Sequence, residues 1–129
     1  MSNGPLPSTR CLLSALPTRQ IGRKVRFLAC VDAYSVKSAV LTLHHAFPQS
    51  CKVQASVDVK LLLQSLKSNQ TDAGQWVHVI GYITSITRSS ASNERSSDVT
   101  DVGVQALVLW VAEDLDLPAY EMSFGNNAK

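Results

Sequence analysis

The 129-residue sequence predicts a single all-β domain that carries short helices. Three observations support this fold class. Most apolar segments alternate with a period of two residues, which is typical of half-buried strands. Only one segment in the middle of the chain changes to the period of an α-helix. The chain length suits one compact domain, and 45% hydrophobic against 17% charged residues is enough to build one core.

Three consecutive strands are predicted in the first half of the chain. Over residues 24–34, apolar side chains alternate with mainly polar ones, although Leu28 and Cys30 interrupt the polar face and need cover. After a tight connection, residues 39–44 alternate again. A third alternating segment covers residues 51–57.

A helix of about three turns is predicted after the third strand. Its apolar residues are Val59, Leu62, Leu63 and Leu66. Asp58 is placed to cap its first turn. Strand-like patterns return at residues 75–88 and 104–112. This order is that of a five-stranded OB-fold barrel, in which a helix between strands 3 and 4 closes one end.

The last two predicted strands each have one unusual feature. Gly81 lies in the middle of the fourth strand, where it suits a bulge. The fifth strand is apolar on both faces, so its outer side needs cover. Between them, residues 89–103 form a Ser-rich stretch that is predicted to be a loop, either functional or disordered.

A short helix is predicted to end the domain, over residues 115–124. Asp114 or Asp116 provides its cap, and Leu117, Tyr120 and Phe124 form one apolar stripe. A helix this short is marginal in water on its own, so it must dock. Two targets remain open from the residues alone: the chain's own fifth strand, or another protein chain.

The whole chain, residues 1–129, is expected to form one OB-fold domain with a flexible N-terminus over residues 1–8. No targeting or membrane-spanning segment is predicted. The three cysteines are widely spaced and lack zinc-site spacing, which favours free thiols in the cytosol or nucleus.

Signals of enzymatic chemistry are weak throughout the sequence. Phosphate-binding, metalloprotease and nucleophile-elbow motifs do not occur. His44 and His45 are adjacent on a strand and point to opposite faces, so they cannot hold one metal together. His78 is more typical of a packed histidine than of a catalytic base. We therefore predict no catalytic residue, metal, cofactor or small-molecule substrate.

The charge pattern permits a modest role in nucleic-acid binding. The net charge is only +2, which disfavours a strong autonomous clamp, but residues 1–60 carry +6 and residues 61–129 carry −4. Single strands are held by cations together with aromatic faces. The candidate cations are Lys24, Arg26, Lys37, Lys52 and Arg88, and the candidate aromatic faces are Tyr34, Phe47 and above all Tyr82.

Four segments in order resemble a known family. They are KVRFLACVDAY, VDVKLLLQSLK, GQWVHVIGYI and VQALVLWVAEDLDLPAYE, and the similarity covers about residues 6–124. This ordered set resembles the fungal type of the small OB-fold subunit, called Ten-one, of the telomeric CST complex.

The resemblance implies a noncatalytic OB-fold subunit that heterodimerises with a larger OB-fold subunit of the complex. Together they would protect single-stranded telomeric DNA ends and regulate telomere replication, in the nucleus at the telomeric region of the chromosome. The small subunit would bind DNA weakly, or only within the complex. By position, the partner-binding residues would be Leu117, Tyr120, Phe124, Met122 and Trp110. The alternative is an autonomous single-stranded DNA- or RNA-binding OB module in replication or translation.

Overall fold

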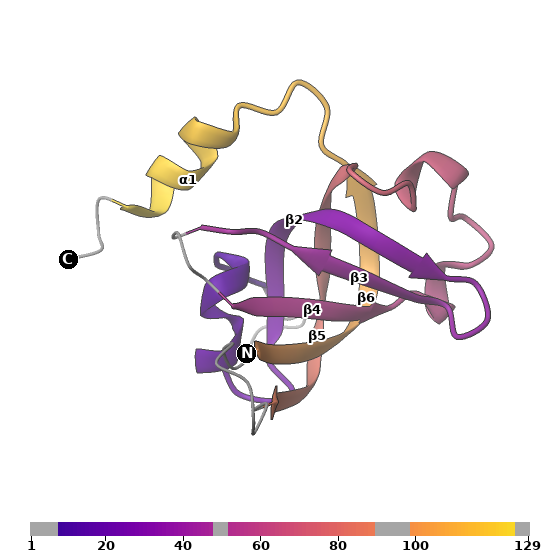
Figure 1. Cartoon of the computed structure of the whole chain (residues 1–129), viewed down its shortest axis with the longest axis horizontal. Helices are drawn as coiled ribbons and strands as arrows, with labels where there is room; N and C mark the ends of the chain where they lie inside the picture. Colours follow the sequence, from indigo (N-terminus) through magenta and orange to yellow (C-terminus); the bar gives the residue numbers. More distant parts are fainter. Residues whose placement is uncertain (1–7, 48–51, 90–98, 126–129) are drawn as a thin grey trace, which may run out of the picture.

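The computed structural model describes residues 8–47, 52–89 and 99–125, which form a closed barrel with a helix laid beside it (Figure 1). Most of the N-terminal segment expected to be flexible lies outside the described residues. In chain order the elements are β1 (Thr9–Arg10), η1 (Leu13–Thr18), β2 (Lys24–Ser35), β3 (Val40–His44), β4 (Val53–Asp58), η2 (Lys60–Leu62), η3 (Ser68–Gln70), β5 (Trp76–Ser89), β6 (Val99–Val111) and α1 (Leu117–Gly125).

The strands are hydrogen-bonded in the order β1-β2-β3-β4-β6-β5, and β5 also pairs with β2 to close the barrel. The long strand β2 pairs with two neighbouring strands. Residues 24–30 pair with β5, and residues 30–35 pair with β3, with a register shift between Val31 and Ala33. Strand β4 runs parallel to β6, and the short extra strand β1 runs parallel to β2. The predicted five-stranded OB-fold barrel is confirmed.

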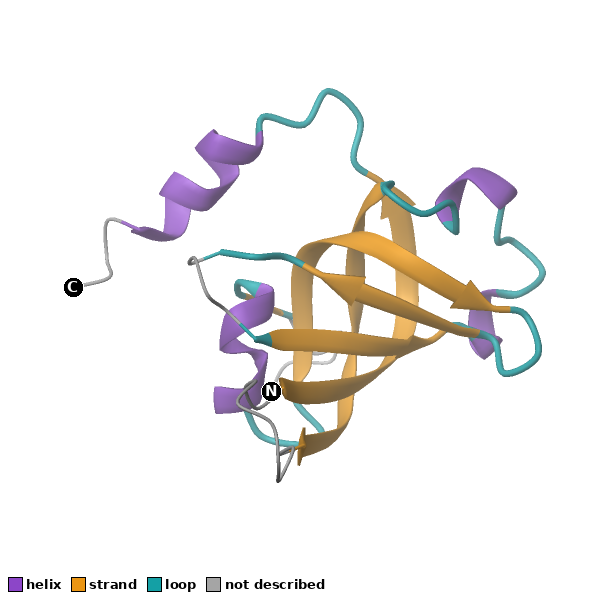
Figure 2. Ribbon diagram, in the orientation of Figure 1, coloured by secondary structure: helices purple, strands orange, loops and turns teal. Residues whose placement is uncertain are grey.

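Side chains from every barrel strand fill the interior, and helical turns close its ends. Phe27, Leu41 and Val79 are completely buried in the core. Figure 2 shows η1 at one end of the barrel and η2 and η3 at the other. Leu13 and Leu16 of η1 are fully buried in the same core. Six residues are too few to show a period, so the sequence predicts no element for this segment.

The predicted three-turn helix after the third strand is wrong. Two short 3₁₀ turns, η2 and η3, stand there instead. Val59 follows the end of β4, and its N–H donates to the Ala39 carbonyl at 2.9 Å. The Ser65 hydroxyl bonds the Leu62 carbonyl at 3.2 Å, a local contact that competes with helical bonding. Asp58 does cap this segment, because its carboxylate accepts from the Lys60 N–H at 2.8 Å.

The predicted loop over residues 89–103 is too long at its C-terminal end, because β6 begins at Val99. Val99 pairs with β5, and residues 100–103 pair with both β4 and β5. Val102 enters the core, and Asp101 is held in the sheet by hydrogen bonds from Gln54 and Ser56. The polar residues at the start of β6 made this part of the strand look like a loop in the sequence. Residues 90–98 lie outside the described residues.

The helix α1 begins two residues later than predicted and ends at Gly125, within the usual uncertainty of helix ends. None of the helices in the described parts of the chain is long and apolar enough to cross a lipid bilayer.

The β5–β6 register shifts at Gly81 as expected, although the extra residue, Leu107, lies in β6. A Cβ atom at Gly81 would overlap the backbone carbonyl of Gln105. We predict that Gly81→Ala lowers the free energy of unfolding by about 2 kcal/mol or more, measured by urea denaturation. Gly22→Ala is the matched control: it has open space but a φ of +95°, so it should cost only about 1 kcal/mol. Equal losses would contradict the close approach of β5 and β6.

Candidate partner and nucleic-acid interfaces

The helix α1 is initiated by Asp116, one of the two predicted caps. The Asp116 carboxylate accepts a hydrogen bond from the Ala119 N–H at 3.0 Å, and its carbonyl accepts one from Tyr120. Pro118 lies in the first turn, where its missing N–H has no helical partner to lose. The other candidate, Asp114, instead takes a left-handed conformation with φ of 53° in the connection to the helix.

The helix docks on the chain's own barrel through aromatic side chains. The Tyr120 ring lies 6.2 Å from His45 and 6.4 Å from His78, and Phe124 packs edge-on against Tyr120 at 5.1 Å. Below them is a row of outward residues on three paired strands: Leu28, His78 and Trp110. Leu28, flagged in the sequence as needing cover, is completely buried. Of the two docking targets left open, the helix packs on its own chain, although its contacts are with β2, β5 and His45 rather than with the fifth predicted strand.

Polar contacts fix the helix in this position. The buried His45 places its Nε2 atom 2.7 Å from the Glu121 carboxylate. Arg10 of β1 donates to the Ser123 hydroxyl at 2.7 Å, and its guanidinium stacks 4.2 Å from the centre of the Phe124 ring. A backbone hydrogen bond links the Tyr120 hydroxyl to Leu28, and burial raises the pKa of Tyr120. Arg10, His45 and Glu121 were missed from the sequence because they lie far apart in it.

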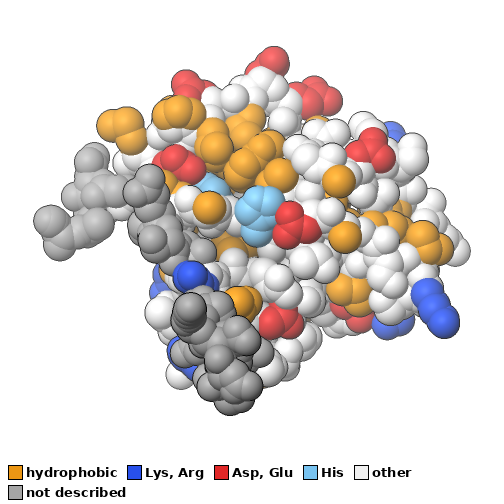
Figure 3. All heavy atoms as spheres, viewed as in Figure 1, with side chains coloured by type: hydrophobic (Ala, Val, Ile, Leu, Met, Phe, Trp, Pro, Cys, Tyr) orange, Lys and Arg blue, Asp and Glu red, His pale blue; other side chains and the backbone are white. Residues whose placement is uncertain are grey.

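The opposite side of α1 is open. Pro118 and Ala119 are exposed, and Met122 is 67% exposed. The nearby outer face of β6 is partly uncovered too, with Val108 45% exposed. Figure 3 shows hydrophobic side chains gathered between the helix and the barrel, beside a histidine. The helix therefore has two faces, one that packs against the barrel and one that meets solvent.

The five predicted partner-binding residues divide between these faces. Leu117, Tyr120 and Phe124 are half-buried, with Tyr120 and Phe124 turned toward the barrel, whereas Met122 points outward. Trp110 stacks on His78 at 4.9 Å. It also lines a hollow of about 630 Å³ whose wall includes Glu113, Asp114 and Asp116 of the connection to α1.

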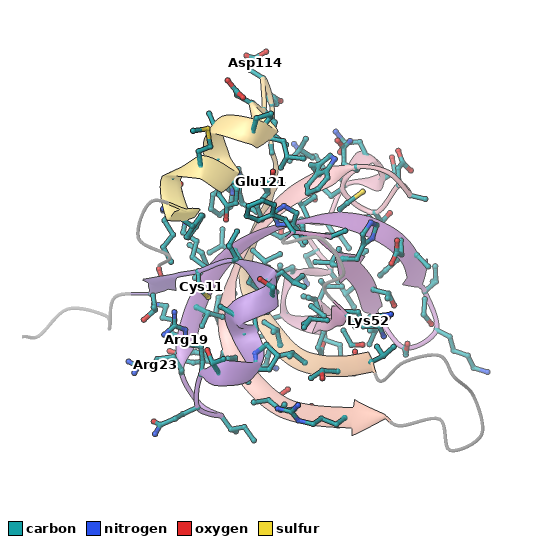
Figure 4. All side chains as sticks on the ribbon, turned by 60° about the vertical axis from the view of Figure 1, so that its left-hand side comes forward. Cys11, Arg19, Arg23, Lys52, Asp114 and Glu121 are labelled. Atoms are coloured by element: carbon teal, nitrogen blue, oxygen red, sulfur yellow. The ribbon has the colours of Figure 1, made fainter. Side chains whose placement is uncertain are left out.

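The six predicted nucleic-acid residues do not form one surface. Lys24 and Tyr82 are directly paired on β2 and β5, and Arg26 lies one outward position further along β2, 5.7 Å over the Trp110 ring. Lys37 is exposed in the β2–β3 turn. Lys52 and Arg88 both adjoin Thr100 at another end of the barrel. Figure 4 places Lys52 on the side away from Arg19 and Arg23.

The outer face of β3 and β4, which OB-folds ordinarily use for oligonucleotides, is not basic. Its outward residues are Val40, Thr42, His44, Gln54, Ser56 and Asp58. Asp32 lies 2.6 Å from the His44 ring, and Asp101 from β6 bonds to Gln54 and Ser56. In the view of Figure 3, Lys and Arg lie at the rim of this face. Its carboxylates disfavour phosphate.

Two cysteines and one histidine have shifted pKa values. Burial raises the pKa of the Cys11 and Cys30 thiols, and Asp32 adds to the effect at Cys30, so both stay protonated. Cys51 lies outside the described residues. Burial lowers the pKa of His78, with repulsion from Arg26 and Arg10 in the same direction. Among the described residues, no group of three or more His, Cys, Asp or Glu side chains is placed to hold a metal.

A family model described as "Telomere capping, CST complex subunit", named Ten1, matches residues 1–124. The chain belongs to the Ten1 family. No curated protein matches the chain in a comparison of sequences.

Solved structures agree with this fold. Ten1 of S. pombe, crystallised as a telomere capping protein, is 20% identical with a TM-score of 0.65, over 93% of this chain and 96% of that one. A chain of the S. pombe Stn1-Ten1 complex matches with the same identity and TM-score, over 95% and 93%. A putative aspartyl-tRNA synthetase of Leishmania major is 17% identical with a TM-score of 0.53, over 86% of this chain and 22% of that one.

The lowered pKa of His78 predicts how stability depends on pH. The unfolded chain binds a proton at this side chain near pH 6.5, whereas the folded chain binds it only at lower pH. The free energy of unfolding should therefore fall as pH drops below about 6.5, by at most about 1.4 kcal/mol per unit from this group. His78→Phe keeps a ring on Trp110 and should show a shallower decline in thermal denaturation between about pH 7 and 5. Equal slopes would show that His78 is not the group responsible.

Proposed function

We propose that this Ten1-family chain is a noncatalytic subunit that heterodimerises with a larger OB-fold subunit, the counterpart of Stn1 in the S. pombe complex. The pair would protect single-stranded telomeric DNA ends and regulate telomere replication, in the nucleus at the telomeric region of the chromosome. Family membership carries this proposal. The apolar outward side of α1 supports it, because monomers seldom expose contiguous apolar surface without an interaction to use it.

The partner surface proposed here is the outward side of α1 together with the neighbouring part of the barrel. Met122 and Leu117 would contact the partner directly. Tyr120 and Phe124 would act by holding the helix in place, since both face the barrel. Trp110 would contribute from the wall of the hollow beside the connection to α1. The carboxylates of that wall suit basic side chains on the partner.

A noncatalytic role is supported by the raised pKa of the Cys11 and Cys30 thiols and by the packing of His78 on Trp110. An autonomous nucleic-acid-binding module has less support. Such a module would need a basic groove with aromatic faces along β3 and β4, where this chain carries Asp58 and the adjoining Asp32 and Asp101.

The partner surface can be tested with one substitution on α1. Met122→Asp should reduce co-purification with the larger subunit at least tenfold, because it places a charge at the centre of an apolar contact. Met122 is 67% exposed, so the thermal midpoint of the isolated chain should change little.

Val36→Asp is the matched control, since Val36 is 79% exposed in the β2–β3 turn, remote from the helix. Val36→Asp should co-purify with the larger subunit as well as the wild-type chain does. If both variants bind the partner normally, the proposed surface is wrong. If the wild-type chain itself captures no larger subunit, the proposed heterodimer is wrong.

A further inference from the structure

We propose that the sugar-phosphate backbone of single-stranded nucleic acid binds along the outer face of β1, β2 and β5, and not on the β3–β4 face. The site would begin in a hollow beside β1 and run across Lys24, Arg26 and Arg10. It deepens the proposed function, because it states where this subunit would touch the DNA that the heterodimer protects.

The hollow provides donors suited to a phosphodiester. It has a volume of about 490 Å³ and lies between β1 and the connection that leads into β2. Arg23 and Lys24 contribute cations to its lining, Ser8 and Thr9 contribute hydroxyls, and Gln20 contributes an amide. Cationic and hydroxyl donors together are the usual contacts of nucleic-acid phosphates. The tight turn that shapes the hollow is fixed by Gly22, which has a φ of +95°.

Cations continue from the hollow along the strands. Lys24 and Arg26 share the outward side of β2, about 7 Å apart at the usual rise of a strand. Arg10 is the register partner of Arg26 on the parallel strand β1. None of the ion pairs formed among the described residues includes an arginine. The charges of the exposed Arg23 and Arg26 are therefore available to an anion, whereas the guanidinium of Arg10 also bonds Ser123 and stacks on Phe124.

Aromatic rings accompany these cations. Tyr82 is half-buried directly opposite Lys24 in the β2–β5 register. Arg26 lies 5.7 Å over the ring of Trp110. A row of cations beside aromatic side chains is the surface that usually binds single-stranded nucleic acid. The β3–β4 face carries carboxylates, whereas this path carries arginines, so the charged side chains of the two faces have opposite signs.

The hollow end of the proposed path lies away from α1, whereas its Arg10 end adjoins the helix. Lys24 lies four residues along β2 from Leu28, which is the position that Tyr120 covers, and this spacing is about 13 Å along a strand. In the view of Figure 4, Arg19 and Arg23 lie below α1. DNA bound in the hollow would therefore not displace the helix.

The test compares two double variants in the assembled heterodimer. Arg23→Gln with Lys24→Gln removes two charges from the hollow, and Lys37→Gln with Lys60→Gln removes two from the β3–β4 side. The probe is a fluorescent oligodeoxythymidine strand, titrated at several salt concentrations, with an oligouridine strand as a second arm. The hollow variant should bind the DNA strand roughly tenfold more weakly, with a salt slope shallower by about 1.4. The control variant should stay within about twofold of the wild type.

Each other outcome has a definite meaning. A greater loss in the control variant, or no loss in the hollow variant, overturns the proposal. If the hollow variant fails to co-purify with the larger subunit, the surface is a protein interface and the proposal is wrong. Equal losses on DNA and RNA support phosphodiester recognition, whereas a loss on RNA alone overturns the assignment to DNA. If the wild-type chain forms no heterodimer, the proposed function fails, and the same variants of the isolated chain, titrated at low salt, still decide the site.

Discussion

The structure depends on covering one row of outward side chains, Leu28, His78 and Trp110, on three paired strands of the barrel. An exposed strand would carry polar side chains at these positions, so without cover the apolar surface of these residues would be in contact with water. The helix α1 removes that contact by placing Tyr120 over the row, with Arg10 and His45 holding the helix from either side. A helix too short to be stable alone and a strand face too apolar to be left bare thus stabilise each other.

This arrangement also divides the surface of the subunit. The side of α1 that packs on the barrel is aromatic and polar, and the side that faces away is apolar around Met122. The arginines of the N-terminal half lie near the first side, while Asp32, Asp58 and Asp101 lie across the barrel. Asp32 and Asp58 belong to the basic half of the sequence, so this difference between faces comes from the fold and not from the charge imbalance between the two halves.

The barrel could be predicted from the sequence because alternation is a local property: the segments corresponding to β2, β3 and β5 each show it within a few residues. The 3₁₀ turns after β4 could not, since Leu62 and Leu66 have the spacing of a helix whether or not the backbone closes one. The first residues of β6 look like loop because Asp101 is polar, and only its bonds to Gln54 and Ser56 explain its place in the sheet. At the candidate site, Tyr120 and Phe124 were visible as a stripe. Arg10 and His45, which hold the helix, are distant from it in the sequence, so only the fold brings them together.

The central claim is that α1 packs on its own barrel and leaves its other side for a partner chain. Amide hydrogen exchange, compared between the isolated chain and its complex with the larger subunit, tests this claim most directly. We expect residues 117–124 to show measurable protection in the isolated chain and much slower exchange in the complex, with residues 36–39 of the β2–β3 turn unchanged. Unprotected exchange of α1 in the isolated chain, or new protection confined to β3 and β4 in the complex, would contradict the account.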